Sequence, residues 1–145
     1  EIACRIGGAH EATFLPLVTG FDITEAAILA ALGQSVDTHK LKHYKVTLPK
    51  KHVSVQLFFC QPCHVEHVPD QKDITSLMGI EDYHCHLSNG DEVLSINNAT
   101  NRAGYFVLTA RDRSTIEEQL VHVYQHLKII DTSGNNCILH RQLIR

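Results

Sequence analysis

The stretch RAGYFVLTARDRSTIEEQLVHVYQHLKI, residues 102–129, joins the two kinds of element that the domain contains. Its first part, residues 102–110, has an unbroken apolar centre, which predicts a strand. Ser114 followed three residues later by Glu117 is the capping box that starts a helix. The apolar residues of that helix recur at helical spacing: Ile116, Leu120, Val123 and Leu127. A strand that leads directly into an amphipathic helix indicates a mixed domain of helices and strands.

Alternating patterns upstream predict further strands. Residues 52–59 predict a strand with one half-buried face, and residues 64–68 predict a second, shorter strand. Residues 81–96 form two alternating runs around Asn89-Gly90, the pair that favours a type I′ hairpin turn. The last apolar run, residues 137–144, predicts an edge strand. The half-buried face consists of Val53, Val55, Leu57 and Phe59.

Helix signals mark the N-terminal region. Residues 12–19 predict a short helical segment. Asp22 can cap a second helix, Glu25 completes its capping box, and Gly33 supplies a left-handed stop. The order of elements therefore predicts an α+β fold in which an antiparallel sheet is accompanied by two main helices.

The polar connection at residues 34–43 is the one plausible domain boundary. It separates residues 1–36 from a C-terminal α+β unit at residues 37–145. A chain of 145 residues with 43% hydrophobic and 20% charged side chains suits one domain with an additional element.

Charge and cysteine content exclude several classes of partner. The net charge of −3 gives no basic excess for nucleic acid or an anionic membrane, and no apolar run is long enough to span a bilayer. Five scattered cysteines do not suggest a secreted disulfide framework, so we expect a reducing, cytoplasmic location.

The motif CQPCH at Cys60–His64 has the spacing of c-type haem attachment, but such proteins are exported, and a turn between strands explains the motif better. Zinc is a second alternative. Structural zinc normally joins two separated segments, and these ligands lie within eight residues unless a second segment at residues 84–86 supplies more. The four candidate ligands are Cys60, Cys63, His64 and His67. His122 and His126 form a further i, i+4 pair that we expect to face solvent.

Glu1 and Arg5 have the spacing of side chains on one face of a strand, and Gly7 and Gly8 follow them. The two charged groups can be a surface ion pair of small energetic weight. Alternatively, a carboxylate that holds Mg²⁺ next to an arginine on phosphate oxygens is what phosphoryl transfer requires. Spacing alone favours the first interpretation.

The stretch EIACRIGGAHEATFLPLVTGFDITEAAILAALGQ, residues 1–34, resembles the end of an ATP-grasp domain. That family carries a Glu-x-Asn-x-Arg strand, a loop, and a small-residue helix that ends in Ala-Leu-Gly. Residues 101–129 resemble the strand and helix that close the C-terminal subdomain of its amino-acid ligase members. Biotin carboxylases resemble the first stretch as well.

The resemblance implies roles for four residues. Glu1 would bind the catalytic Mg²⁺ that bridges the ATP phosphates, and Arg5 would steady the transferring phosphate. Gly7 and Gly8 would line the pocket of the acyl substrate. Ala3 stands where the family carries an asparagine that is a second metal ligand, which leaves open that the parent enzyme is degenerate.

The resemblance therefore implies the C-terminal part of an ATP-dependent carboxylate–amine ligase with an acyl-phosphate mechanism. Its partners would be the N-terminal and ATP-binding parts of the enzyme and small carboxylate and amine substrates, with a homodimer as one expected assembly. The family's ATP-binding strands precede Glu1, so we expect the isolated chain to be inactive and without cofactor. The alternative is a non-catalytic binding module stapled by zinc.

Overall fold

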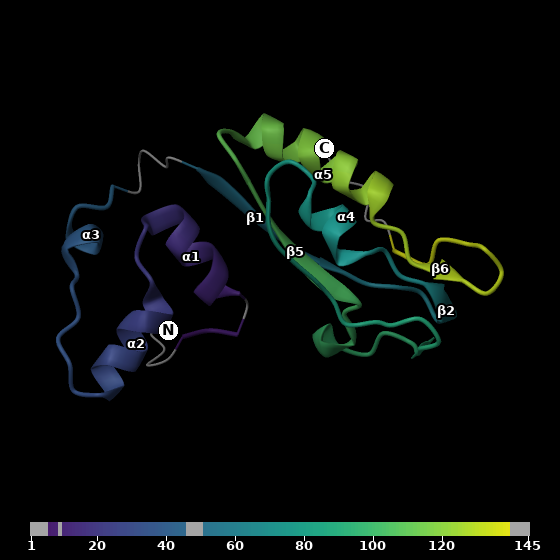
Figure 1. Ribbon diagram of the computed structural model, residues 1–145, viewed down its shortest axis with the longest axis horizontal. Coiled ribbons are helices and arrows are strands. Elements are labelled where there is room, and N and C mark those ends of the chain that lie inside the picture. The colour runs from purple at the N-terminus through teal and green to yellow at the C-terminus, as the bar shows by residue number, and fades with distance from the viewer. Residues whose placement is uncertain (1–5, 9, 46–50, 140–145) are drawn as a thin grey trace.

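The computed structural model describes residues 6–8, 10–45 and 51–139, so Glu1 and Arg5 lie outside the described residues. An N-terminal arm of three helices comes first: α1 (Glu11–Thr19), α2 (Ile23–Ala31) and the four-residue α3 (His39–Lys42). Two small sheets and the long helix α5 (Arg113–His126) follow, so helices and antiparallel strands are combined in one chain (Figure 1). This confirms the predicted α+β class.

Strand β5 (Gly104–Ala110) is the centre of the main sheet. It pairs antiparallel with β1 (His52–Phe58) on one side and with β3 (Ile80–Cys85) on the other. The register places Gly104 opposite both Phe58 and Cys85. Consecutive residues of β5 are buried, so both faces of the strand are covered, which explains why its sequence is continuously apolar.

The second sheet has the order β4-β2-β6, with β2 (Cys63–His67) between β4 (Glu92–Val93) and β6 (Ile130–Asp131). The predicted hairpin over residues 81–96 is therefore wrong, because β3 pairs with β5 and β4 pairs with β2. The reason lies in the loop between them.

The loop after β3 is held by β2 and the residue that follows it. The side-chain oxygen of Asn89 accepts a hydrogen bond from Val68 N at 2.9 Å, and Gly90 N donates to Val65 O at 2.7 Å. These bonds carry the chain across to the second sheet instead of turning it back along β3. Gly90 adopts φ 93°, the left-handed backbone that its lack of a Cβ permits.

Helix α5 covers one face of the main sheet and closes the core. Its Ile116, Leu120 and Val123 are buried against a cluster that includes Phe106 and Leu108 of β5. The helix confirms the predicted apolar face. Four short elements were not predicted: α3, which lies in the expected polar connection, the helix α4 (Gln71–Thr75) beside β3, a 3₁₀ turn over Ala99–Asn101, and β6.

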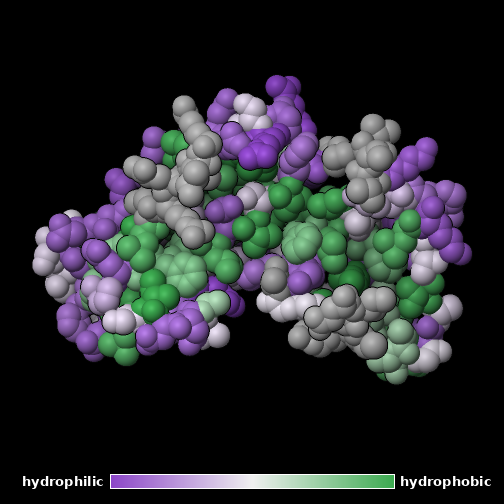
Figure 2. Space-filling model, turned by 180° about the vertical axis from the view of Figure 1, so that it is seen from behind, coloured by the Kyte–Doolittle hydropathy of each residue, from purple (hydrophilic) through white to green (hydrophobic). Residues whose placement is uncertain are grey.

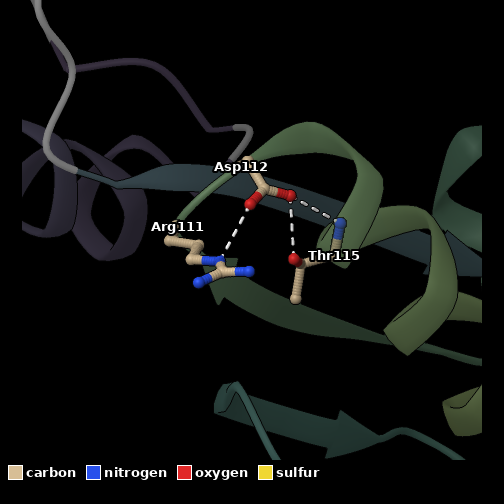
Figure 3. A network of polar contacts seen from close by, with 3 residues as sticks. All are labelled: Arg111, Asp112 and Thr115. Atoms are coloured by element: carbon tan, nitrogen blue, oxygen red, sulfur yellow. Dashed lines mark hydrogen bonds and ion pairs between the residues drawn. The ribbon is translucent and has the colours of Figure 1, made fainter.

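The N-cap of α5 is Asp112 and not Ser114. One carboxylate oxygen of Asp112 accepts hydrogen bonds from the backbone N and the hydroxyl of Thr115, both at 2.8 Å, while the other oxygen accepts from Arg111 at 3.0 Å (Figure 3). These bonds, the backbone one first, hold the pKa of Asp112 below its ordinary value. Asp112 reaches the third helical residue, which is the geometry of an N-cap, so Ser114 lies within the first turn.

The buried face of β1 also differs from the prediction. Phe58 is 1% exposed and stacks on Tyr83 with ring centroids 6.3 Å apart, whereas Leu57 is 39% exposed. Near the C-terminus, Ile138 forms an isolated antiparallel bridge with Cys60. Residues 140–144 of the predicted edge strand lie outside the described residues.

Helices α1 and α2 confirm the predicted N-terminal helices, and Asp22 caps α2 by accepting from Thr24 N and Glu25 N at 2.9 Å. No residue of either helix is buried, although α1 contacts β1.

In the described part of the chain, no single helix is long and apolar enough to cross a membrane. Helices α1 and α2 reach the required length and apolar composition only when they are taken together, and a bend of 110° separates them. Figure 2 shows apolar side chains reaching the surface.

A first prediction concerns Gly104. A Cβ at this position would collide with the carbonyl oxygen of His84 and the ring of Phe58, so Gly104→Ala forces β5 away from both neighbours. We expect the free energy of unfolding, measured by urea denaturation, to fall by about 1–3 kcal/mol.

Gly8→Ala is the matched control for this substitution. No atom lies within 4 Å of the Cβ that it would add, so its stability should stay within about 0.5 kcal/mol of wild type. Equal stability of the two variants would show that the close approach of β3 and β5 is not a structural constraint.

Candidate active site

The glycine loop, residues Gly7 and Gly8, is the part of the predicted site that the structure describes. Both glycines are exposed and lie just before α1. A Cβ at Gly7 would occupy the position of the Glu11 carboxyl group, whereas Gly8 has open space around it. The backbone of this loop is therefore accessible to a molecule that approaches from solvent.

His10 anchors the glycine loop to the main sheet. Its imidazole lies on the ring of Tyr105 in β5, with ring centroids 3.9 Å apart. His10 is also the one described non-glycine residue with positive φ, at 68°. A left-handed backbone conformation costs free energy in a non-glycine residue and persists where surrounding contacts enforce it. The contacts between the glycine loop and the sheet therefore constrain the backbone of His10.

Two further imidazoles complete a histidine cluster, which we define as His10, His84, His86 and Tyr105. His84 lies at the end of β3 and is paired in register with Tyr105. Its ring centroid is 4.8 Å from that of His86 and 6.1 Å from that of Tyr105. The cluster thus joins three segments that are far apart in the sequence.

Burial and neighbouring groups shift the pKa values of two members of the cluster, His86 and Tyr105. Burial, followed by the charges of His84, Arg102 and His10, lowers the pKa of His86. The Tyr105 hydroxyl donates a hydrogen bond to Asp82 at 3.1 Å, and burial together with that bond raises the tyrosine pKa. Near neutral pH the cluster therefore offers a neutral imidazole and a protonated phenol, groups that donate and accept hydrogen bonds.

Arg102 adds a fixed cation beside these rings. Its Nη1 donates to the carbonyl oxygen of Ala99 at 3.4 Å, while its buried Nε has no hydrogen-bond partner among the described residues. A guanidinium whose N–H donors are not all used can donate hydrogen bonds to an anionic oxygen. The combination of the glycine loop, the imidazoles and this arginine could bind a small polar molecule that carries negative charge.

The candidate zinc ligands do not converge. Cys60 is buried and Cys63 partly buried, whereas His64 and His67 are exposed. Within residues 6–8, 10–45 and 51–139, no group of three or more histidine, cysteine or acidic side chains is arranged to hold a metal ion. His122 and His126 are exposed as expected, with Nδ1 of His126 2.9 Å from the His122 carbonyl oxygen.

A cavity of about 670 Å³ lies apart from this cluster, between the end of α1, α3 and the approach to β1. Among the described residues that line it, the lysines are Lys40, Lys45 and Lys51. The last of these also lies 3.6 Å from the Glu81 carboxylate.

Sequence reasoning placed residues 84–86 only in a zinc site and missed the cluster. The available signal was the spacing of His84 and His86, which puts them on one face of an extended segment. Their meeting with His10 and Tyr105 depends on the strand order and on the fold of the N-terminal loop, which no local pattern reports.

The comparisons with known proteins define the family. The model of L-amino acid ligase C-terminal domain 2 matches residues 56–131. This is more than half of the chain, and the chain belongs to this family. No curated protein sequence matches it significantly.

Solved structures show the same fold. The L-amino acid ligase from Bacillus licheniformis is similar with a TM-score of 0.69 and 14% identity, over 88% of this chain and 31% of that one. The phosphoribosylglycinamide synthetase from Anaerococcus prevotii gives a TM-score of 0.71 and 10% identity, over 88% and 32%. The chain thus spans about a third of each, and the predicted ATP-grasp ligase fold is confirmed.

A second prediction concerns His86. In His84→Gln one positive neighbour is lost, so the pKa of His86, followed by NMR titration of its ring protons, should rise. Because the folded chain protonates His86 less readily than the unfolded chain, wild type should also lose stability as the pH falls through the ordinary histidine range.

His122→Gln provides the control, because His122 lies on α5 and makes its ring contact with His126. This variant should leave the His86 titration unchanged. An unchanged pKa in His84→Gln would contradict the electrostatic coupling within the cluster.

Proposed function

We propose that this chain is the C-terminal part of an ATP-dependent carboxylate–amine ligase that forms an acyl phosphate with Mg-ATP. The family match over residues 56–131 is the observation that carries the proposal. A second observation supports it: the glycine loop, which the sequence resemblance assigns to the acyl pocket, is anchored to the sheet of that domain through His10 and Tyr105.

Each residue has a chemical task in this proposal. The Glu1 carboxylate would hold Mg²⁺, a hard cation that prefers oxygen ligands and that neutralises phosphate charge when bound. Arg5 would present a planar fork to the oxygens of the transferring phosphate. Gly7 and Gly8 carry no side chains, so the acyl group of the substrate can approach their backbone, in keeping with their exposure. Arg102 and the imidazoles would face the polar end of that substrate.

The rest of the enzyme would cover the N-terminal arm. Helix α2 is largely apolar, yet Ile28 is 55% exposed and the following Leu32 is 66% exposed. Exposed apolar side chains of this kind typically mark a contact surface. We infer that the ATP-binding part of the ligase lies against α1 and α2, in the cytoplasm, and that the isolated chain lacks most of the phosphate contacts.

A third prediction tests the proposed function in the full-length enzyme. Arg5→Ala should lower kcat by about 10²–10³, because a fixed cation acts mainly on charge that develops in the transition state. Arg5→Lys should not restore activity, because the ammonium group of lysine cannot donate two parallel hydrogen bonds to phosphate oxygens as a planar guanidinium does. Glu1→Gln should slow turnover and also raise the Mg²⁺ concentration needed for half-maximal rate.

Arg113→Ala is the matched control for these variants. Arg113 is an exposed arginine on α5 that pairs with Glu117 at 2.9 Å. Its steady-state kinetics should equal those of wild type. Turnover within about threefold of wild type in both Arg5 variants would mean that Arg5 is a surface charge.

A fourth prediction concerns the 145-residue chain itself. Titration calorimetry with ATP and Mg²⁺ should detect no binding in the micromolar range, because the strands that hold the nucleotide belong to the remainder of the proposed enzyme. Micromolar binding by this chain would contradict the proposal that the nucleotide is held by the remainder of the enzyme.

A further inference from the structure

The solvent-exposed side of α5 carries two histidines that are one helical turn apart. His122 and His126 belong to the same 14-residue helix at i, i+4 spacing, so their side chains are neighbours on its surface. Both residues are exposed. Their imidazole rings meet edge to face, with centroids 4.5 Å apart and planes inclined at 61°. Helix α5 alone therefore brings two nitrogen ligands together.

A hydrogen bond sets the tautomer of the second histidine. Nδ1 of His126 lies 2.9 Å from the carbonyl oxygen of His122. A carbonyl oxygen only accepts hydrogen bonds, so Nδ1 carries the proton and donates it. In the neutral ring the lone pair is then on Nε2, the atom left for a ligand. Histidines that bind metal ions in proteins are oriented in the same way, because their other nitrogen donates to a carbonyl or carboxylate.

The separation of the rings fits a single metal ion held by both imidazoles. With a metal–nitrogen bond of about 2.1 Å and roughly 1.1 Å from nitrogen to ring centre, two imidazoles at right angles around one ion have centroids about 4.5 Å apart. Tetrahedral angles would need about 5.2 Å. The observed 4.5 Å corresponds to the right angle, which neighbouring ligands adopt in tetragonal Cu²⁺ and Ni²⁺ sites.

The position along the helix also favours a positively charged ligand. His126 is the last residue of α5. The carbonyl groups of a final helical turn give the helix end a partial negative charge, which stabilises cations there. Val123 and Leu127 in the same stretch are 0% exposed, so packing against the core holds this turn in place. A ligand pair on a rigid, packed element is already arranged for its ion.

Two other histidine pairs are less suited to a cation. His39 and His43 have ring centroids 4.4 Å apart, but they lie at the four-residue α3 and line the same cavity as three lysines, whose charges repel a metal ion. His84 and His86 have ring centroids 4.8 Å apart, and the positive charge of Arg102 acts on that pair. Neither pair has the carbonyl contact that orients the ring of His126 among the hydrogen bonds of the described residues.

We propose that His122 and His126 form a binding site for a divalent transition metal ion of the Ni²⁺ or Cu²⁺ type. Two imidazole nitrogens hold the ion and water completes its coordination, so the ion is exchangeable. Imidazole suits these ions, whereas Mg²⁺ prefers oxygen ligands. The site is thus distinct from the Mg²⁺ that the proposed ligase would hold at Glu1, and it does not depend on the ligase activity.

The test uses the complete 145-residue chain, isotopically labelled for NMR and freed of metal by dialysis against EDTA. Ni²⁺ is the probe, because it is paramagnetic and broadens the signals of residues near the bound ion. We expect broadening centred on the last two turns of α5. The melting temperature should rise with Ni²⁺ concentration, because an ion that binds the folded pair and not the unfolded chain stabilises the fold. Mg²⁺ at the same concentration should produce neither effect.

Single variants identify the ligands. His126→Gln removes one ligand, so it should weaken Ni²⁺ binding by more than the roughly tenfold that loss of an orienting contact costs. His122→Gln should have the same effect. His39→Gln is the matched control, because it removes one member of another i, i+4 pair, and it should bind Ni²⁺ as wild type does.

Three results would overturn the proposal. They are broadening centred on another histidine pair or on the cysteines, an equal response to Mg²⁺, and unchanged Ni²⁺ affinity in His126→Gln. Both glutamine substitutions on α5 replace exposed side chains, so we expect the variants to fold. The wild-type broadening map decides the location of the site even if one of them does not.

Discussion

The rest of the structure depends on the close approach of three chain segments at Gly104. The ring of Phe58 and the carbonyl oxygen of His84 occupy the space that any larger residue would need there. This contact fixes where β5 begins relative to both of its neighbours. The β1 pairs follow from that register throughout, and the β3 pairs follow from it as far as Asp82, where a bulge shifts the pairing. One consequence is that His84 lies opposite Tyr105. The strand register therefore places two members of the histidine cluster, and the N-terminal loop brings His10 to them.

Strand β5 also separates the core from the candidate site. Phe106 and Leu108 belong to the core cluster under α5, and the ring of Phe106 lies 5.5 Å from that of Tyr124. Tyr105 points to the opposite face, where it meets His10. The other residues on the Tyr105 face, Val107 and Thr109, are also buried, so contact with the histidine cluster is confined to the Tyr105 end of the strand.

The sequence was sufficient for the elements whose pattern is local. Helix α5, strand β5 and the cap at Asp22 follow from apolar periodicity and side-chain chemistry within a few residues. The hairpin around Asn89-Gly90 was wrong because distant β2 competes for the same loop. The histidine cluster was missed because it depends on strand order. The roles of Glu1, Arg5, Gly7 and Gly8 rest on resemblance and stay predictions.

The N-terminal arm and the sheet domain differ in how their backbone amides exchange with solvent. No residue of α1 or α2 is fully buried, so we expect their hydrogen bonds to open by fluctuations that leave the sheet intact. The amides of β5 are paired on both sides and covered by α5, so they exchange when the whole domain unfolds. The rate of deuterium uptake by the helices of the arm would then depend on whether another part of the protein covers them. Slow uptake in α1 and α2 would indicate that a partner is bound there.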